Sequence, residues 1–566
     1  MQRRIRTRYQ LQTMRKLPVI LLVISAAALI AVGATRSSKS DISRNLDTFA
    51  SIYKALQTSY VDTIDADKSM NTAISAMLNE IDPYTEYIPE SEQDEFLTIS
   101  TGEYGGIGAY IMQRPEGGVQ VTEPRDGTPS QKAGLRPGDM FLVINGDSVT
   151  NADSKTVSNM LRGQAGTDVK VTVKRPYVTD SILDFTITRS KIDINPVPYY
   201  GVERGDIGYI QLTTFNDKTY EKTRDALKAL KSNPAVKSIV LDLRGNGGGL
   251  LESAVQVVSL FVPKGTEVLR TRGKGLQNER IYKTPYQPVD TDIPLAVLVN
   301  SGSASSAEIV TGALQDLDRA VIVGDRSFGK GLVQSTRQLP YNGLLKVTIA
   351  KYYIPSGRLI QAIDYSHRNA DGSVGRIPDS LTTVWHTRAG REVRDGGGIT
   401  PDLKVELPEG NRLLYNIIRD NWSFDFANRY AATHSTIPPA EQFEVTDTIF
   451  NEFKAFINPD KFKYDRTTDL IMEQLEKAVK TEGYLDTAVQ TQMDTLKNLL
   501  RHDLNHDLDL NRKAISQYLA GEIVERYYSE RGGIIQALKT DIELDSAAAV
   551  LHSPERYRSI LAPAKH

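Results

Sequence analysis

The chain has 566 residues, a formal net charge of −2 at pH 7 and no cysteine. A chain of this length predicts three or four domains. The nearly balanced charge argues against a nucleic-acid-binding protein, and the lack of cysteine excludes disulfides, thiolate catalysis and thiolate metal sites.

Residues 1–40 predict an export signal. Basic residues crowd the first sixteen positions, an apolar run follows from Leu17 to about Val32, and the first acidic residue is Asp41. A basic flank on one side of an apolar run is typical of a signal peptide or a signal anchor. The run is short for a membrane span and small residues end it at Ala34, so both cleavage and anchoring stay open. Either outcome places the protein in the periplasm, or on the inner membrane facing it.

Residues 41–100 predict an N-terminal helical region. Apolar residues recur every three or four positions from Leu46 to Tyr60 and again from Met70 to Ile81, which is the spacing of one face of a helix. Pro83 then ends the second helix, because the residue before a proline disfavours helical geometry.

A glycine-rich turn, Gly105-Gly106-Ile107-Gly108, precedes an apolar strand at Ala109–Gln113. Successive N–H groups of such a turn can form a concavity for an anion, although a glycine turn by itself is more often an ordinary hairpin. Two further blocks, 132–139 and 143–146, accompany it, and together they make residues 101–190 resemble a PDZ domain. That resemblance implies that a chain end adds as a strand and presents its carboxylate to Gly105, Gly106, Ile107 and Gly108.

A compact α/β core is predicted at residues 191–406. Strands are expected at 207–212, 238–243 and 294–299. A glycine-rich turn, Arg244–Gly249, leads from the second strand into an apolar helix, and its glycines let backbone amides approach a ligand closely. A dinucleotide-binding fold is the competing interpretation, but Leu250 replaces the third glycine of its fingerprint.

The run Asn300–Glu308 follows the third strand and predicts a tight turn into a helix. That geometry exposes a serine and points the first N–H groups of the helix at the group that the serine attacks. Histidine is the usual base, but a Ser-His-Asp triad here would require His367 or His386 to fold back, because no histidine precedes them. Lys330 lies between two glycines and is the alternative base, if burial lowers the pKa of its amine from about 10.4 towards neutrality. Gln334 could hold the amine by a hydrogen bond.

These motifs resemble those of the C-terminal processing (tail-specific) peptidase family. The family's order and spacing of nucleophile, lysine base and glutamine match Ser305, Lys330 and Gln334. The resemblance implies an α/β multi-domain protein: a crotonase-like spiral α/β protease core with an inserted PDZ domain (α+β) and helical N- and C-terminal regions. It also implies an oxyanion hole made by the N–H of Ser306, where the family usually has alanine, and by that of Gly248.

Gly247 is the near alternative for the second oxyanion amide. The run Gly324–Lys330 resembles a phosphate-binding loop, but the next residue is not serine or threonine and the following residues favour a strand.

His502 and His506 have the spacing of a helical metal pair without a clear third ligand, so we expect no metal and no cofactor. Residues 364–397 indicate a surface insertion, and apolar spacing predicts a C-terminal helical domain at 407–566.

The resulting prediction is a serine endopeptidase that cleaves exported proteins near apolar C-terminal ends, with recognition or gating by the PDZ domain. The expected partners are protein or peptide substrates with free apolar C-termini, and the resemblance implies a homodimer or a higher homo-oligomer. A non-catalytic PDZ scaffold and a crotonase-like acyl-CoA enzyme stay open as alternatives. A penicillin-recognising Ser-Lys acyltransferase is excluded, because Glu308 stands where its lysine would follow Ser305.

Overall fold

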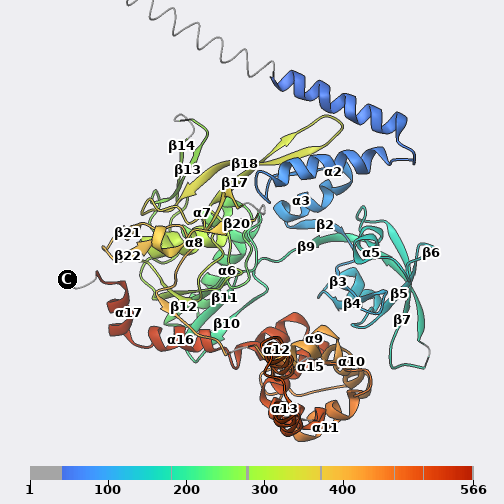
Figure 1. Ribbon diagram of the computed structural model, residues 1–566. Coiled ribbons are helices and arrows are strands. Elements are labelled where there is room, and N and C mark those ends of the chain that lie inside the picture. Colours follow the sequence, from blue (N-terminus) through green and yellow to red (C-terminus); the bar gives the residue numbers. More distant parts are fainter. Residues whose placement is uncertain are drawn as a thin grey trace, which may run out of the picture. The chain divides into compact units, whose positions relative to one another are not determined.

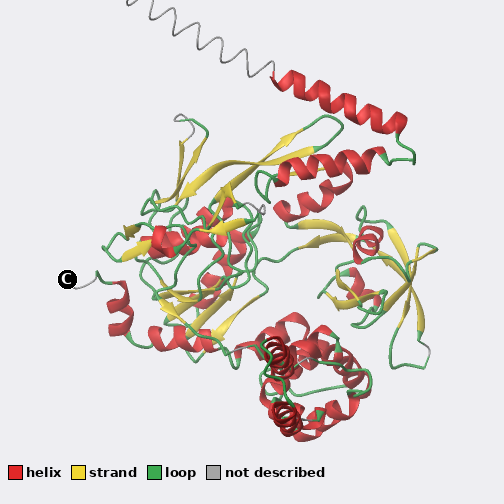
Figure 2. Cartoon of the chain, in the orientation of Figure 1, coloured by secondary structure: helices red, strands yellow, loops and turns green. Residues whose placement is uncertain are grey.

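The computed structural model describes residues 41–179, 181–275, 279–369, 373–408, 410–464, 466–500 and 503–563. The chain divides into two compact units, residues 1–87 and 88–566, whose helices and strands appear in Figures 1 and 2. The predicted export signal and His502 lie outside the described residues. None of the helices in the described ranges is both long and apolar enough to cross a membrane.

The first unit contains the two predicted helices, at residues 41–59 and at α2 (Ala66–Asn79). The side chain of Asp65 accepts a hydrogen bond from the Lys68 N–H (2.9 Å) and so satisfies one of the donors that a helix start leaves unpaired. The apolar stripe predicted for the first helix is exposed, with Leu46 64% and Phe49 45% accessible. The spacing of the apolar residues therefore correctly predicted a helix, but these side chains are not buried within the chain.

A small β domain with its own core follows. Its main sheet has the order β3-β4-β5-β7-β8, with β6 paired to β5, and a separate ladder joins β2 to β9. β1 (Glu86–Ile88), η1 (Glu90–Glu92) and α3 (Gln93–Thr101) precede this domain in the chain. Its own elements are β2 (Glu103–Gly106), β3 (Ala109–Gln113), β4 (Val119–Pro124), α4 (Pro129–Ala133), β5 (Met140–Ile144), β6 (Asp147–Ser148), α5 (Ser154–Leu161), β7 (Asp168–Lys174), β8 (Ile182–Thr188) and β9 (Ser190–Asp193). Strand β3 lies at the edge of the described sheet and contacts α5. An edge strand beside a helix is the arrangement with which PDZ domains add a peptide strand.

The predicted α/β core is built on a six-stranded sheet of order β10-β11-β12-β15-β16-β23. All neighbours are parallel except β10 and β11. The strands are β10 (Tyr199–Glu203), β11 (Ile207–Gln211), β12 (Ser238–Asp242), β15 (Leu295–Val299), β16 (Val321–Gly324) and β23 (Leu403–Lys404). Alternate residues of these strands enter two different hydrophobic cores. The sheet is therefore buried on both faces, as parallel sheets generally are.

Helices α6 (Thr219–Lys231), α7 (Leu251–Val258) and α8 (Ser306–Asp316) cover one face of this sheet. A second, antiparallel sheet contains β13 (Glu267–Gly273), β14 (Glu279–Lys283), β17 (Leu332–Gln338) and β18 (Leu344–Tyr353). The prediction of a strand rather than a helix after Lys330 is thus confirmed by β17, and a phosphate-binding loop, which needs a helix there, is excluded. The finer description of the core as a crotonase-like spiral stays a prediction.

The predicted surface insertion forms two hairpins. They pair β19 (Ile363–Arg368) with β20 (Val374–Arg376), and β21 (Val384–His386) with β22 (Glu392–Arg394), with η2 (Asp379–Leu381) between them. Arg391 in the second hairpin is 9% exposed and forms ion pairs with Asp318 (2.7 Å) and Asp402 (2.6 Å). Part of this segment therefore packs into the protein instead of lying wholly on its surface.

A helical domain with a separate aromatic-rich core follows β23. It comprises α9 (Arg412–Arg419), α10 (Trp422–Thr433), α11 (Asp447–Phe456), α12 (Thr467–Thr481), α13 (Thr487–Leu499), α14 (Leu504–Leu510) and α15 (Arg512–Leu538). The chain then returns to the core. Leu544 and Leu551 of α16 (Ile542–Leu551) are buried against the second face of the core sheet, followed by α17 (Pro554–Leu561).

Candidate active site

Ser305 occupies a strained turn between β15 and α8. Its backbone has φ 54° and ψ −113°, and α8 begins at the next residue. A positive φ is uncommon for a residue other than glycine and persists only where the surroundings enforce it. Ser305 is half-buried, whereas its neighbours Ala304 and Ser306 are buried. The turn therefore presents one serine at the N-terminus of a helix, as the sequence predicts.

Hydrogen bonds join the serine turn Asn300–Glu308 to the glycine-rich loop Arg244–Gly249 and the residue before it. The Ser303 hydroxyl donates to the Leu243 carbonyl oxygen (2.8 Å), and the Ala304 N–H donates to the Asn246 carbonyl oxygen (2.9 Å). The Ser306 hydroxyl donates to the Gly249 carbonyl oxygen (2.9 Å). Serine in place of the usual alanine at 306 thus adds a hydrogen bond that fixes the glycine-rich loop Arg244–Gly249 against the serine turn.

Gly248 lies directly against Ser305. A Cβ atom on Gly248 would stand 2.8 Å from the Ser305 Cβ, and the residue has φ 101°, so only glycine fits there without strain. Its N–H donates to the Asn246 side-chain oxygen (2.9 Å), and that bond would have to open for the N–H to serve a substrate. Gly247, the alternative, is exposed. The choice between the two amides stays a prediction.

Glu308 is the residue that the sequence analysis missed. Its carboxylate is fully buried and accepts hydrogen bonds from the N–H groups of Ser305 (2.8 Å), Lys330 (2.8 Å) and Gly329 (2.7 Å) and from the Ser327 hydroxyl (2.6 Å). Burial raises the pKa of Glu308 to about 7, against the opposing effect of its four donors. The capping-box pattern, serine followed three residues later by glutamate, is the signal that could have found it.

Lys330 and Ser305 are fixed by the same two side chains. Besides sharing Glu308, both residues face Tyr352, which is 1% exposed. The Tyr352 hydroxyl donates to the Lys330 carbonyl oxygen (2.6 Å) and lies 3.2 Å from the Ser305 carbonyl oxygen. The structure therefore brings the backbones of the predicted nucleophile and the predicted base together, although 24 residues separate them in the sequence.

Gln334 lies on β17 immediately after an irregularity in its pairing with β18. Its side-chain amide donates to the Thr348 hydroxyl (3.1 Å). A register irregularity re-aims the side chain that follows it. Its predicted role in orienting the Lys330 amine stays a prediction.

The predicted carboxylate-binding residues divide between a strand and a turn. Gly105 and Gly106 belong to β2 and pair with β9, whereas Ile107 and Gly108 form the turn before β3. The Gly108 carbonyl oxygen accepts the Arg125 N–H (2.9 Å), which ties this turn to the far end of β4. Whether the turn holds a carboxylate stays a prediction.

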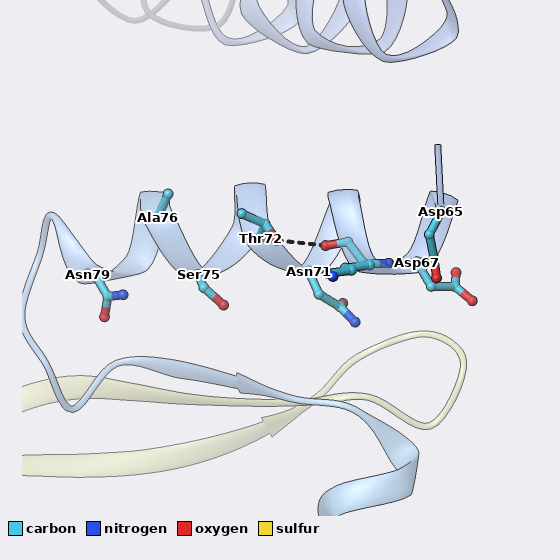
Figure 3. A pocket seen from close by; sticks show the side chains of 8 residues that line it. Asp65, Asp67, Asn71, Thr72, Ser75, Ala76 and Asn79 are labelled. Carbon is cyan, nitrogen blue, oxygen red and sulfur yellow. Dashed lines mark hydrogen bonds between the residues drawn. The ribbon is translucent and has the colours of Figure 1, made fainter. Parts of the chain in front are cut away.

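One hollow in the first unit is unrelated to these residues. It is lined by small polar and acidic side chains of α2 and its cap, among them Asp65, Asn71 and Ser75 (Figure 3). The Thr72 hydroxyl there donates to the Lys68 carbonyl oxygen (2.8 Å), an interaction within the helix. Nothing in this set resembles a nucleophile beside a base, so we assign it no catalytic role.

Comparison with protein-family models identifies three modules. Residues 206–366 match peptidase family S41, residues 105–187 match a PDZ domain, and residues 413–551 match the C-terminal helical domain of probable PDZ-proteases. The first two ranges fall within the core and the small β domain described above, and the third covers the helical domain together with α16.

Individual relatives agree with the family models. The chain is 37% identical over 344 residues to a carboxy-terminal-processing protease of Bartonella bacilliformis, covering 60% of this chain and 78% of the relative. It is also 37% identical over 493 residues to a probable CtpA-like serine protease of Staphylococcus aureus strain N315, covering 83% and 90%. A solved photosystem II D1 C-terminal processing protease is 28% identical, with a TM-score of 0.35 over 63% of this chain and 92% of that one. The chain therefore belongs to the carboxy-terminal-processing proteases of peptidase family S41, serine-type enzymes that act on protein substrates.

Proposed function

We propose that Ser305 is the nucleophile of this peptidase, that Lys330 is its general base and that Gln334 orients the base. The observation that carries the proposal is one carboxylate oxygen of Glu308, which accepts from both the Ser305 and the Lys330 N–H (2.8 Å each). One carboxylate thus holds the backbones of two residues that are distant in sequence. They lie beside a helix N-terminus, which favours developing negative charge.

The reaction follows from these roles. A neutral Lys330 amine takes the Ser305 proton as the hydroxyl oxygen attacks a peptide carbonyl carbon. The N–H groups of Ser306 and of Gly248, or Gly247 in its place, stabilise the oxyanion. Protonated Lys330 gives its proton to the leaving amine, the acyl-enzyme forms, and Lys330 then activates the water that releases it.

We propose exported proteins with apolar, unstructured C-terminal ends as substrates. Edge strand β3 and helix α5 supply a surface on which a chain end can add as a strand, and residues Gly105–Gly108 would receive its carboxylate. Amidation of a substrate's C-terminus tests this role, because it removes the charge without altering the cleaved bond. We expect KM to rise about tenfold or more, and an unchanged KM would exclude capture of the carboxylate.

We further propose that the PDZ domain gates the active site. Arg114, which follows β3, makes a two-pronged ion pair with Asp425 of α10 (2.9 and 3.0 Å), so peptide addition at β3 would act next to a contact with the helical domain. Asp425→Asn should change the degree to which an added C-terminal peptide stimulates cleavage. Identical stimulation curves for the variant and the wild type would refute a gate at this contact.

The remaining proposals concern location and assembly. The basic and apolar pattern of residues 1–40 supports export to the periplasm, with or without retention on the inner membrane. The exposed apolar stripe on the helix at residues 41–59 supports assembly into a homodimer or a higher homo-oligomer. Sedimentation of the chain with and without residues 1–60 tests the assembly, and equal sizes would refute a role for that helix.

The central experiment compares wild-type protein with Ser305→Ala and Lys330→Ala, using an unfolded protein with an apolar C-terminus. Both variants should lose cleavage by at least about 10³-fold while keeping the wild-type circular dichroism spectrum. Retained cleavage in either folded variant would reject the assignment of that residue. A PDZ scaffold predicts no Ser305-dependent cleavage at all, and an acyl-CoA enzyme predicts binding of an acyl-CoA, which calorimetry measures.

A further inference from the structure

The last segment of the chain reaches back to the glycine-rich loop of the active site. After α15 ends at Leu538, the chain turns, and α16 packs on the core sheet through Leu544, Ala547 and Leu551. Asp541 caps α16 by accepting the Leu544 N–H (2.9 Å). The start of α16 is therefore fixed on the sheet, and its acidic side chains have defined positions.

Two of these acidic side chains bind Arg244. The Arg244 guanidinium donates to Asp541 through two nitrogens (3.1 and 2.6 Å) and to Glu543 through one (2.5 Å). The same guanidinium binds Asp242 at the end of β12 (2.6 Å at the closest), and the Tyr209 hydroxyl also donates to Asp242 (2.5 Å). A planar guanidinium held on several sides has little freedom to rotate.

Arg244 is the first residue of the loop whose Gly248 lies against Ser305. Its N–H donates to Asp242 (2.9 Å), and the next N–H, that of Gly245, donates to the Asn300 side chain in the serine turn (3.0 Å). The loop then reaches Gly248, which stands against Ser305. Arg244 thus begins a six-residue loop and Gly248, which contacts Ser305, lies near its end, so a displacement at the start of the loop moves the amides beside Ser305.

Stability alone does not account for this cluster. Three carboxylates, from Asp242, Asp541 and Glu543, are 11% exposed or less around one guanidinium. The Glu543 Oε1 atom is buried and has no hydrogen-bond partner among the described residues, which is a cost to folding. Buried ionic clusters are often no more stabilising than apolar packing of the same volume, whereas they fix geometry that apolar contacts leave loose.

We propose that Asp541 and Glu543 are positioning residues for the peptidase reaction. They hold Arg244, and through it they set the loop Arg244–Gly249 at the distance from Ser305 that the oxyanion amides require. This inference rests on the proposed catalytic role of Ser305. It makes the segment beyond the helical domain a working part of the active site.

The test uses the full chain with Asp541→Asn, Glu543→Gln and both together. Asp545→Asn is the matched control, because Asp545 lies on the same helix, loses the same charge and pairs with Arg204 (2.6 Å) away from the loop. Three quantities are measured for each protein: kcat and KM on an unfolded substrate, the rate of labelling by a fluorophosphonate, and the midpoint of thermal unfolding. The labelling rate reports the oxyanion site directly, because the phosphoryl oxygen of the probe occupies it.

We expect the double variant to lose kcat by about 10- to 100-fold, since removing an oxyanion donor outright costs about 10²–10³. The labelling rate should fall by the same factor, with KM within about twofold of wild type, while the control keeps all three values. A folded double variant with wild-type kcat, or a loss confined to KM, would overturn the inference. If the double variant does not fold, Glu543→Gln decides by the same criteria. Full activity of Ser305→Ala would instead reject the proposed function, so the two failures are distinguishable.

Discussion

We expect Glu308→Ala to lower kcat by about 10²–10³, the range found when one preorganised element of an oxyanion site is lost. The Glu308 carboxylate accepts hydrogen bonds from the backbone N–H groups of both Ser305 and Lys330 (2.8 Å each). Alanine leaves these two N–H groups, the Gly329 N–H and the Ser327 hydroxyl without the acceptor that Glu308 provides. The strained Ser305 backbone, with φ 54°, then loses one of the hydrogen bonds that hold it.

The cost to stability follows from the same contacts. Each buried N–H or hydroxyl left without an acceptor lowers the unfolding free energy by about 1–3 kcal/mol. Glu308→Gln is the informative comparison, because the amide keeps one oxygen as an acceptor but turns an NH₂ group towards the other donors. If the oxygen stays on Ser305 and Lys330, the glutamine variant should lose less kcat than the alanine variant while losing a similar part of the stability.

The raised pKa of Glu308, about 7 against an ordinary 4.5, gives this prediction a pH dependence. Between these values the folded state binds a proton that the unfolded state has released, so the contribution of Glu308 to the unfolding free energy falls as pH rises through this window. The fall is at most about 3 kcal/mol. It should be absent from Glu308→Gln, which does not titrate.

The assay combines single-turnover cleavage with urea unfolding of the three proteins at pH 5, 6, 7 and 8. A labelled substrate at saturating enzyme isolates the chemical step from binding. Two outcomes would refute the reasoning: a folded Glu308→Ala protein with kcat within threefold of wild type, or a stability difference between wild type and Glu308→Gln that does not change with pH.

Four further variants test other contacts. Gly248→Ala should abolish detectable cleavage, because its Cβ would collide with Ser305. A Cβ at Gly247 meets nothing within 4 Å, so Gly247→Ala should keep activity within about tenfold of wild type. Equal activities of the two variants would contradict the close packing of Gly248 against Ser305. Tyr352→Phe removes the hydroxyl that binds the Lys330 carbonyl oxygen and should lower kcat about tenfold with little change in KM, so a change in KM alone would count against it. Arg358→Met strands the buried carboxylate of Asp316 (2.8 Å) and should lower the unfolding free energy by about 3–5 kcal/mol, measured by urea unfolding; a loss below 1 kcal/mol would contradict a buried charge there.

Periodicity and turn chemistry predicted several elements of the core. The apolar run before Asn300 became β15, and the small residues after it became the turn into α8. Local signals of this kind are encoded by neighbours in the chain, so a single sequence reveals them. The family resemblance added the modules, which the family models confirm for the peptidase, PDZ and helical regions.

The contacts that hold the site together were not predictable in the same way. Glu308 lies in a helix whose eleven residues are all buried, and nothing in its local pattern distinguishes a carboxylate that binds Lys330 from one that only caps its own helix. The Arg244 cluster joins residues 297 to 299 positions apart. Pairings across such distances depend on how the chain returns, which helical or strand periodicity does not encode.

The path of the chain explains how residues so distant in sequence come into contact. The core sheet ends at β23, the helical domain from Arg412 to Leu538 follows, and α16 then closes the core. A module inserted in this way is attached to the core at both of its ends, so a shift of its α15 relative to the sheet pulls on the short connection to Asp541. Because Asp541 binds Arg244, such a pull acts on the loop beside Ser305. On the proposed role of Ser305, an insertion whose exit is bonded to the loop Arg244–Gly249 influences the reaction without contributing any group that touches the substrate.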